Sequence, residues 1–167
     1  MSEQLSATVV VVIGGGPITV PARLRGVDVA AIIAADGGFD AAIDAGLEPT
    51  QLVGDLDSIS AEGLATAEAS GVPVHRHPAD KDATDTEVAL ELALELTVGQ
   101  PQRELVVLGP DRSDRLDHLI GALTALGHPS LAGFGSVTAF LGTAEVAIVH
   151  PTHTVTLDLP SGRVVSV

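Results

Sequence analysis

Two aspartates stand two residues apart in the segment GDLDS, residues 54–58, directly after the apolar pair Leu52 and Val53. Like charges this close repel each other, so the pair is either a solvated turn or surrounds a cation. Carboxylate oxygens are hard ligands that suit Mg²⁺. Asp55 and Asp57 are therefore candidate metal ligands, and a simple Asx turn is the alternative that the segment alone leaves open.

A second acidic segment surrounds Lys81, the only lysine of the chain. Its neighbours are Asp80 and Asp82, and it lies just before residues 84–96, whose sequence TDTEVALELALEL predicts the strongest helix of the chain. The free N–H groups at a helix N-terminus favour anions. A phosphate could therefore be bound by Lys81 together with this helix end.

A metal-bound phosphate would connect these two acidic segments. The carboxylates that would hold the Mg²⁺ are Asp55, Asp57 and Asp85. Positioning and charge neutralisation of this kind provide most of the catalysis in phosphoryl transfer. Thr84 and Asp85 could also simply cap the helix, with Thr84 and Glu87 as a capping box, and capping does not exclude a role in binding.

The elements that must position these residues alternate along the chain. Short β-branched and apolar runs predict strands at 8–13, 29–35, 51–53, 72–75 and 104–109. Helical spacing and end signals predict helices at 39–47, 60–71, 84–96 and 115–127. Strands that alternate with helices over short connections predict the α/β class, with an open, mostly parallel sheet and helices on both faces.

Acidic residues follow four of these strands, where ligands bind in open α/β sheets. The first cluster begins Asp36-Gly37-Gly38, which alone is a common turn, and the last spans residues 111–118, which could partly be a solvated loop. No single cluster is informative, but the carboxyl ends of parallel strands share one edge. The sequence therefore predicts an acidic site at that edge.

From about Gly135 the pattern changes to strand-like pieces without helices between them. We expect an α/β domain over residues 1–142 and the beginning of a small β region over 143–167, which ends within an apolar strand and looks incomplete. The segment GGGP at 14–17 lacks the third glycine of a dinucleotide fingerprint. His75 and His77 alternate on a predicted strand and are interpreted as a solvent-facing pair.

Composition excludes several functions. The 167 residues carry a formal net charge of −14 and no cysteine. Such a chain is not expected to bind a nucleic-acid backbone through its bulk surface, and disulfides, zinc–thiolate sites and thiol catalysis are excluded. The N-terminus shows no signal peptide, and no apolar run reaches the length of a membrane helix, so a cytoplasmic location is expected.

Three segments together resemble thiamine pyrophosphokinases: ADGGFDAAIDAGLEPTQLVGDLDSI at 35–59, KDATDTEVAL at 81–90 and RLDH at 115–118. Their order and spacing agree with that family over most of residues 8–142. The resemblance implies that the α/β domain binds Mg-ATP as co-substrate. The thiamine hydroxyl would attack the β-phosphorus, releasing AMP and forming thiamine diphosphate.

The resemblance also implies a homodimer that holds thiamine between the α/β domain of one subunit and a C-terminal β-sandwich of the other. The pieces from 143 onward resemble the start of that sandwich. Carried over by position, the metal and phosphate-handling carboxylates are Asp55, Asp57 and Asp85. The residues that support the phosphates are Lys81, Asp82 and Thr84. Those that shape the nucleotide pocket and its fourth wall are Asp36, Gly37, Gly38, Arg115, Asp117 and His118.

The chain departs from the family pattern at several positions. Ser113-Asp114 replaces a Gly-Gly pair, Ala122 replaces an asparagine, and Phe39-Asp40 replaces Ala-Asn; the tryptophan expected to help hold thiamine has no counterpart. Two alternatives to a thiamine pyrophosphokinase therefore stay open. One is a diphosphokinase for another small alcohol, such as a pterin. The other is a nucleotide-binding or scaffold domain without turnover.

Overall fold

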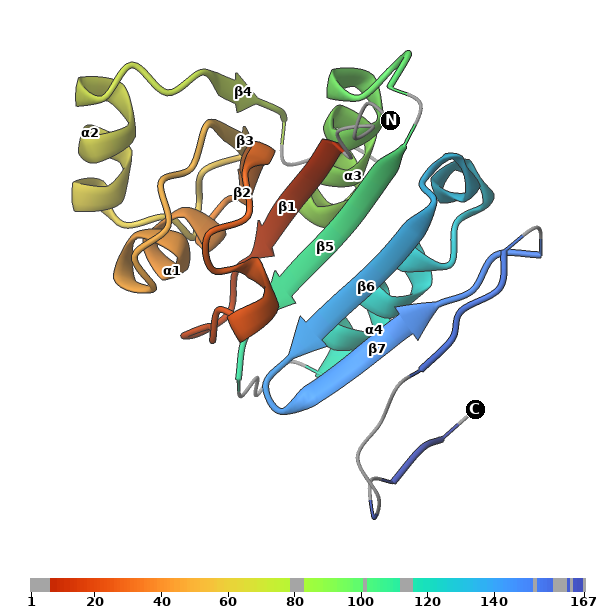
Figure 1. The fold of residues 1–167 in the computed structure, drawn as a ribbon. Helices are drawn as coiled ribbons and strands as arrows, with labels where there is room; N and C mark the ends of the chain where they lie inside the picture. Colours follow the sequence, from red (N-terminus) through yellow and green to blue (C-terminus); the bar gives the residue numbers. More distant parts are fainter. Residues whose placement is uncertain are drawn as a thin grey trace.

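A single seven-stranded sheet forms the centre of the molecule (Figure 1). The computed structural model describes residues 7–78, 83–100, 102–111, 116–151, 153–157, 162 and 164–166. The strands are β1 (Ala7–Ile13), β2 (Val29–Ala35), β3 (Gln51–Gly54), β4 (Val74–Arg76), β5 (Arg103–Gly109), β6 (Ser136–Leu141) and β7 (Ala144–Ile148). Their order is β4-β3-β2-β1-β5-β6-β7, and all neighbours are parallel except β6 and β7.

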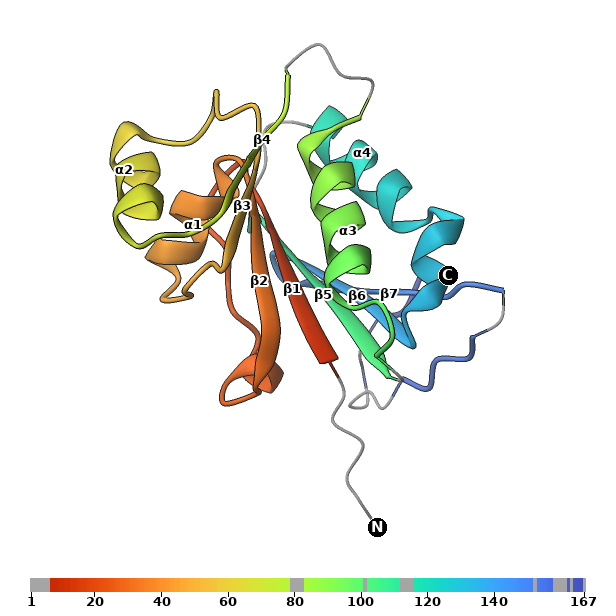
Figure 2. The ribbon, with the colours of Figure 1, turned by 90° about the horizontal axis from the view of Figure 1, so that it is seen from above.

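Helices cover both faces of this sheet, which confirms the predicted α/β class. The α-helices are α1 (Gly38–Asp44), α2 (Ala61–Ala69), α3 (Asp85–Leu96) and α4 (Leu116–Leu126), and two short 3₁₀ helices are η1 (Ala22–Leu24) and η2 (Pro129–Gly133). Figure 2 shows α1 and α2 on one face and α3 and α4 on the other. In the described part of the chain, no helix combines the length and apolarity needed to cross a membrane.

The central strand β1 is buried on both sides, which explains its continuous run of valines. Val9 and Val11 pack with residues of α3 and α4, whereas Val10 and Val12 pack with residues of α1. Each such side chain contributes about 1.5 to 3 kcal/mol by leaving water. The core is stabilised mainly by aliphatic side chains, with Phe39 and Phe134 the buried aromatic residues.

Two predicted helix starts are confirmed at the level of single hydrogen bonds. Thr84 precedes α3 and accepts a hydrogen bond from the Glu87 N–H at 3.2 Å, while the Glu87 carboxylate accepts one from the Thr84 N–H at 2.7 Å. The backbone and hydroxyl donors of Thr84 lower the pKa of Glu87. At the start of α2, the Ser60 hydroxyl accepts a hydrogen bond from the Gly63 N–H at 2.9 Å.

The C-terminal strands differ from the sequence expectation. Residues 144–148 lie within the segment predicted to begin a separate β domain at 143, yet they form β7 and pair antiparallel with β6 in the same sheet. The tight turn at Gly142, which has a φ of 61°, brings the chain directly back onto β6. The α/β sheet therefore extends beyond residue 142, and the division at 142/143 needs that correction. A second domain after residue 148 stays a prediction.

The start of α1 lies unusually close to the end of β1. A Cβ atom on Gly38 would collide with the carbonyl oxygen of Val12, and one on Gly14 would come within 3.0 Å of the Gly38 nitrogen. Backbone atoms cannot move aside as a flexible side chain can. Glycine at these positions therefore sets the distance between β1 and the segment that follows β2.

We expect Gly38→Ala to lower the free energy of unfolding by at least about 2 kcal/mol, because the added methyl group overpacks a rigid backbone contact. Gly121→Ala is the matched control. Gly121 lies inside α4, and a Cβ there would meet nothing within 4 Å. The control should gain about 0.5–1 kcal/mol from helix propensity. Urea unfolding of both variants checks this, and an equal effect of the two would contradict it.

Candidate active site

Three carboxylates converge at the carboxyl edge of the sheet. Asp36 follows β2, and Asp55 and Asp57 lie in the loop after β3. One oxygen from each of the three carboxylates can be chosen so that all lie within 4.8 Å of one another. Strands β2 and β3 are parallel neighbours, so their ends bring Asp36 close to Asp55 and Asp57, although 19 and 21 positions separate it from them in sequence. The predicted acidic site at this edge is thus present as a geometric cluster.

Asp36 is the buried member of this cluster, with 6% of its surface exposed. Its carboxylate accepts hydrogen bonds from the Ser58 N–H at 3.1 Å and the Ile59 N–H at 3.0 Å. Burial raises the pKa of Asp36 to about 6, with contributions from Asp57 and Asp85, while these backbone donors partly oppose the rise. Its backbone is in the left-handed region, with a φ of 46°.

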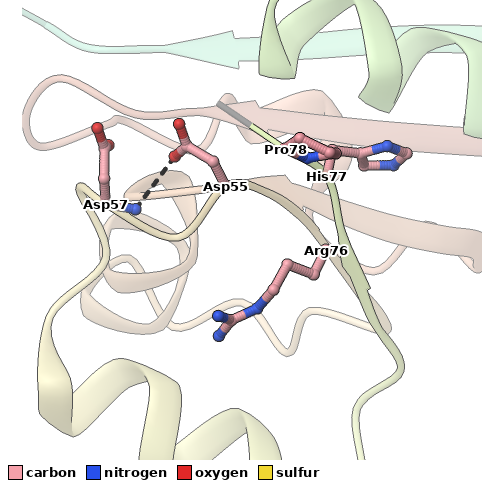
Figure 3. A pocket seen from close by; sticks show the side chains of 5 residues that line it. All are labelled: Asp55, Asp57, Arg76, His77 and Pro78. Atoms are coloured by element: carbon pink, nitrogen blue, oxygen red, sulfur yellow. Dashed lines mark hydrogen bonds between the residues drawn. The ribbon is translucent and has the colours of Figure 1, made fainter. Parts of the chain in front are cut away.

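The loop that carries the other two carboxylates has a fixed local geometry. The Asp57 N–H donates to Asp55 Oδ1 at 3.1 Å, so the Asx turn considered as an alternative does exist (Figure 3). Leu56 between them has a φ of 67° and packs against the buried residues around Phe39. The Ser58 hydroxyl donates to Asp57 at 2.8 Å and is the largest cause of the lowered pKa of Asp57.

Gly54 makes room for two acidic side chains at once. A Cβ at this position would lie 3.1 Å from Cβ of Asp36 and 3.3 Å from Cγ of Asp85. Its φ of 145° is also one that other residues rarely adopt. Asp85, the first residue of α3, therefore lies beside the cluster, but the mutually close set contains Asp36 in its place. Which carboxylates bind the metal stays a prediction.

The remaining predicted residues lie in different relations to this cluster. A Cβ on Gly37 would come within 3.1 Å of the Ser58 carbonyl oxygen, so the segment 36–38 packs closely against the loop. Asp117 and His118 are exposed in the first turn of α4, with His118 Nε2 3.9 Å from Asp117 Oδ2. Three further predicted residues lie outside the described part of the chain: Lys81, Asp82 and Arg115.

The donor set fits a hard divalent cation. Three carboxylates that lie close together in a partly buried position carry like charges, and an ion with oxygen ligands would relieve their repulsion. Burial raises the pKa of Asp36 because it disfavours the charged carboxylate, and a bound cation would offset that cost. The described residues here thus provide the ligands that Mg²⁺ prefers.

Comparison with known proteins identifies the family. The model of the domain described as "Thiamin pyrophosphokinase, catalytic domain" matches residues 27–133, which include every member of the carboxylate cluster. The chain belongs to the thiamin pyrophosphokinase family.

Individual relatives support the same assignment. The thiamine pyrophosphokinase of Bacillus subtilis (strain 168) is 32% identical over 94 residues, which are 56% of this chain and 42% of that protein. A crystal structure of a thiamin pyrophosphokinase family protein from Enterococcus faecalis aligns with a TM-score of 0.63 and 26% identity, over 82% of this chain and 62% of that one. The structure of the Bacillus subtilis enzyme aligns with a TM-score of 0.59 and 28% identity, over 80% and 60% of the two chains. The chain thus matches less than two thirds of the length of these relatives.

Two departures from the thiamin pyrophosphokinase pattern have structural explanations. Ala122 lies on the side of α4 that packs into the core, with 3% of its surface exposed, so this position does not face solvent. Asp40 accepts hydrogen bonds from the Ser60 N–H and hydroxyl, each at 2.7 Å, and thereby joins α1 to the start of α2. Ser113 and Asp114 lie outside the described residues.

The structure adds residues that sequence reasoning missed. A cavity of about 520 Å³ beside the cluster is lined by Asp55, Asp57, Arg76, His77 and Pro78. The sequence predicts that His75 and His77 are a solvent-facing pair. His77 instead lines this cavity, and Nε2 of His75 lies 2.7 Å from Oε1 of Gln51 on β3. Only the pairing of β4 with β3 places Arg76 and His77 here, and no sequence signal specifies that register.

The pKa of Asp36 predicts a pH dependence. The folded-state pKa of about 6 lies above the ordinary 3.8, so the stability that protonation contributes is fully present below pH 4 and is lost as pH rises through 6. Asp36→Asn has no such proton. Without divalent cations, we expect the variant to gain stability relative to the wild-type protein between pH 4 and 7, by at most about 3 kcal/mol.

Urea unfolding of both proteins across this pH range measures the difference directly. Working with the difference cancels the opposite pH dependence of Glu87, whose lowered pKa favours folding above its ordinary range. The pH dependence of Asp57 cancels only in the part due to Ser58 and Asp55, because Asp36 is itself one cause of the lowered pKa of Asp57. A difference that does not change with pH would show that Asp36 titrates normally.

Proposed function

We propose that this chain is the catalytic part of a thiamine diphosphokinase, which transfers diphosphate from Mg-ATP to the hydroxyl of thiamine. The observation that carries the proposal is the convergence of Asp36, Asp55 and Asp57 within a region that matches the family's catalytic domain. Asp85 beside Gly54 adds a fourth carboxylate. The activity, the substrates and the homodimer are inferences from family membership.

The chemistry requires charge neutralisation more than covalent participation by the protein. The hydroxyl oxygen of thiamine loses its proton to solvent and forms a bond to the β-phosphorus, the bond from this phosphorus to the oxygen shared with the α-phosphorus breaks, and AMP leaves. Mg²⁺, when bound, offsets the negative charge of the phosphates during this transfer. The role of Asp55, Asp57 and either Asp36 or Asp85 is to hold that ion in place.

The fixed loop geometry supports this role. The Asx turn and the left-handed Leu56 orient the carboxylates of Asp55 and Asp57 before any ligand is present. Donors from Ser58 and Ile59 stabilise the Asp36 carboxylate in the same way. Preorganised groups need no rearrangement during the reaction, and this is the main source of electrostatic catalysis.

The direct test is calorimetric titration with ATP in the presence and absence of Mg²⁺, followed by a measurement of AMP release with thiamine. Mg-dependent ATP binding together with thiamine-dependent AMP release would support the proposal. Binding without AMP release would favour another acceptor alcohol, such as a pterin, or a nucleotide-binding domain without turnover. No ATP binding under either condition would refute the proposed nucleotide site.

We expect Asp55→Asn and Asp57→Asn each to lower Mg-ATP-dependent turnover by at least about 100-fold, because each removes a charge that holds the metal. Stability should be unchanged or higher, since repulsion within the cluster is relieved. AMP release and thermal unfolding together check both parts.

Asp28→Asn is the matched control for these variants. Asp28 is exposed, lies just before β2 at the opposite edge of the sheet, and its substitution changes the net charge by the same amount. The control should retain full activity. A large loss of stability in the Asp55 or Asp57 variants would instead mark these residues as structural.

A further inference from the structure

Strand β7 forms an edge of the sheet that has little protection against pairing. In the described part of the chain it pairs with β6 alone, without a bulge, over Ala144–Ile148. These five residues include no proline or lysine, the residues that often protect an edge strand from pairing with another strand. The opposite edge is different, because β4 has three residues, contains Arg76 and lies between Pro73 and Pro78.

The helix behind this edge has an uncovered apolar side. Leu116, Ile120 and Leu123 of α4 are exposed by 66%, 55% and 40%, and their spacing places them on one side of the helix. Another side of α4 packs into the core, where Ala122 and Leu126 belong to the cluster against which β7 also packs. Figure 1 shows α4 behind β6 and β7. The apolar side of α4 and the open edge of β7 therefore lie in the same part of the molecule.

This part of the chain is almost uncharged, in contrast to the rest. Glu145 is the only aspartate, glutamate, lysine or arginine in residues 119–157, although the whole chain has 22 acidic and 8 basic residues. Two copies that each carry a net charge of −14 repel one another over most of their surface. A second copy can approach the region of α4, β6 and β7 with the least repulsion, and the centre of a protein interface is typically depleted of charge.

An antiparallel pair of identical strands is related by a two-fold axis, so an open edge is complementary to a copy of itself. We propose that two copies of this chain associate through β7, which joins their sheets into one, with the apolar sides of α4 packed across the same axis. Pairing that is symmetric about Val146 places Glu145 opposite Ala147 of the second copy, so the two glutamates do not face each other. The inference does not rest on the proposed function. Its surface also differs from that of the dimer implied by the family resemblance, which uses a C-terminal sandwich.

Other occupants of this surface predict a different result in solution. If residues 154–167 covered it, or a strand of a different protein did, the purified chain would be a monomer. The oligomeric state and its dependence on α4 and β7 therefore decide between these occupants.

The test is sedimentation velocity over a range of protein concentrations. We expect a monomer–dimer equilibrium in the wild-type protein, with a dissociation constant in the micromolar range or below. Ile120→Glu should weaken the dimer by at least about tenfold, because a charged side chain replaces an apolar contact. Ile43→Glu is the matched control. Ile43 is 42% exposed in α1 on the other face of the sheet and receives the same change in charge, so this variant should dimerise as the wild-type protein does (Figure 2).

A single cysteine tests the strand pairing independently of α4. The chain has no cysteine, so Val146→Cys can form a disulfide only with a second copy. Directly opposite residues of an antiparallel pair have Cα atoms about 4.5–5.5 Å apart, a distance that a disulfide spans. Air oxidation should therefore give a covalent dimer of this variant. Val74→Cys, on the opposite edge strand β4, is the control and should give far less of it.

Three outcomes would overturn the inference. The first is a wild-type protein that stays monomeric at about 100 μM, because an interface of standard size binds more tightly. The second is equal association of the Ile120→Glu and Ile43→Glu variants, which would indicate another surface or a general effect of net charge. The third is equal cross-linking of the two cysteine variants. None of these measurements involves Mg-ATP or thiamine, so the inference and the proposed function can fail separately.

Discussion

Repulsion between the carboxylates of Asp36, Asp55 and Asp57 is the constraint on which the carboxyl edge of this molecule depends. Three like charges within 4.8 Å of one another would separate if their chain segments were free to move. They are held by backbone N–H donors to Asp36 and by the Asx turn that links Asp55 and Asp57. Asp36 is the only member of the three that is buried, and burial is the main reason that its pKa is raised, with smaller contributions from Asp57 and Asp85.

The sheet imposes this proximity through close backbone contacts. Gly14 and Gly38 bring the end of β1 against the start of α1, and Gly37 brings the same segment against the loop at Ser58. Gly54 then leaves room for both Asp36 and Asp85 beside the end of β3. At each of these positions a side chain would meet backbone or a carboxylate. The carboxylate cluster thus follows from backbone geometry as much as from the acidic residues themselves.

The sequence predicts the elements well and the finer contacts less well. Apolar runs and helix signals identify the strands and helices of the sheet, including the Thr84 capping box, because these depend on local chemistry. The edge shared by Asp36, Asp55 and Asp85 follows from the parallel topology. The grouping of Asp36 with the paired aspartates and the position of Arg76 depend on strand register, which short strands such as β3 and β4 do not encode in their composition. Strands β6 and β7 form a hairpin that depends on the turn at Gly142. From the sequence pattern alone, this hairpin cannot be told from the start of a new domain.

Leu56 determines how the loop at the centre of the site would respond thermodynamically to an ion. Its left-handed backbone costs about 1–2 kcal/mol, and its packing against the apolar residues around Phe39 offsets that cost in the folded chain. The ordering of the loop is therefore completed during folding. An ion arriving between Asp55 and Asp57 would lose its hydration water but would not have to freeze the chain around it. Its affinity would be governed by dehydration and charge, with a small conformational entropy change and little change in heat capacity.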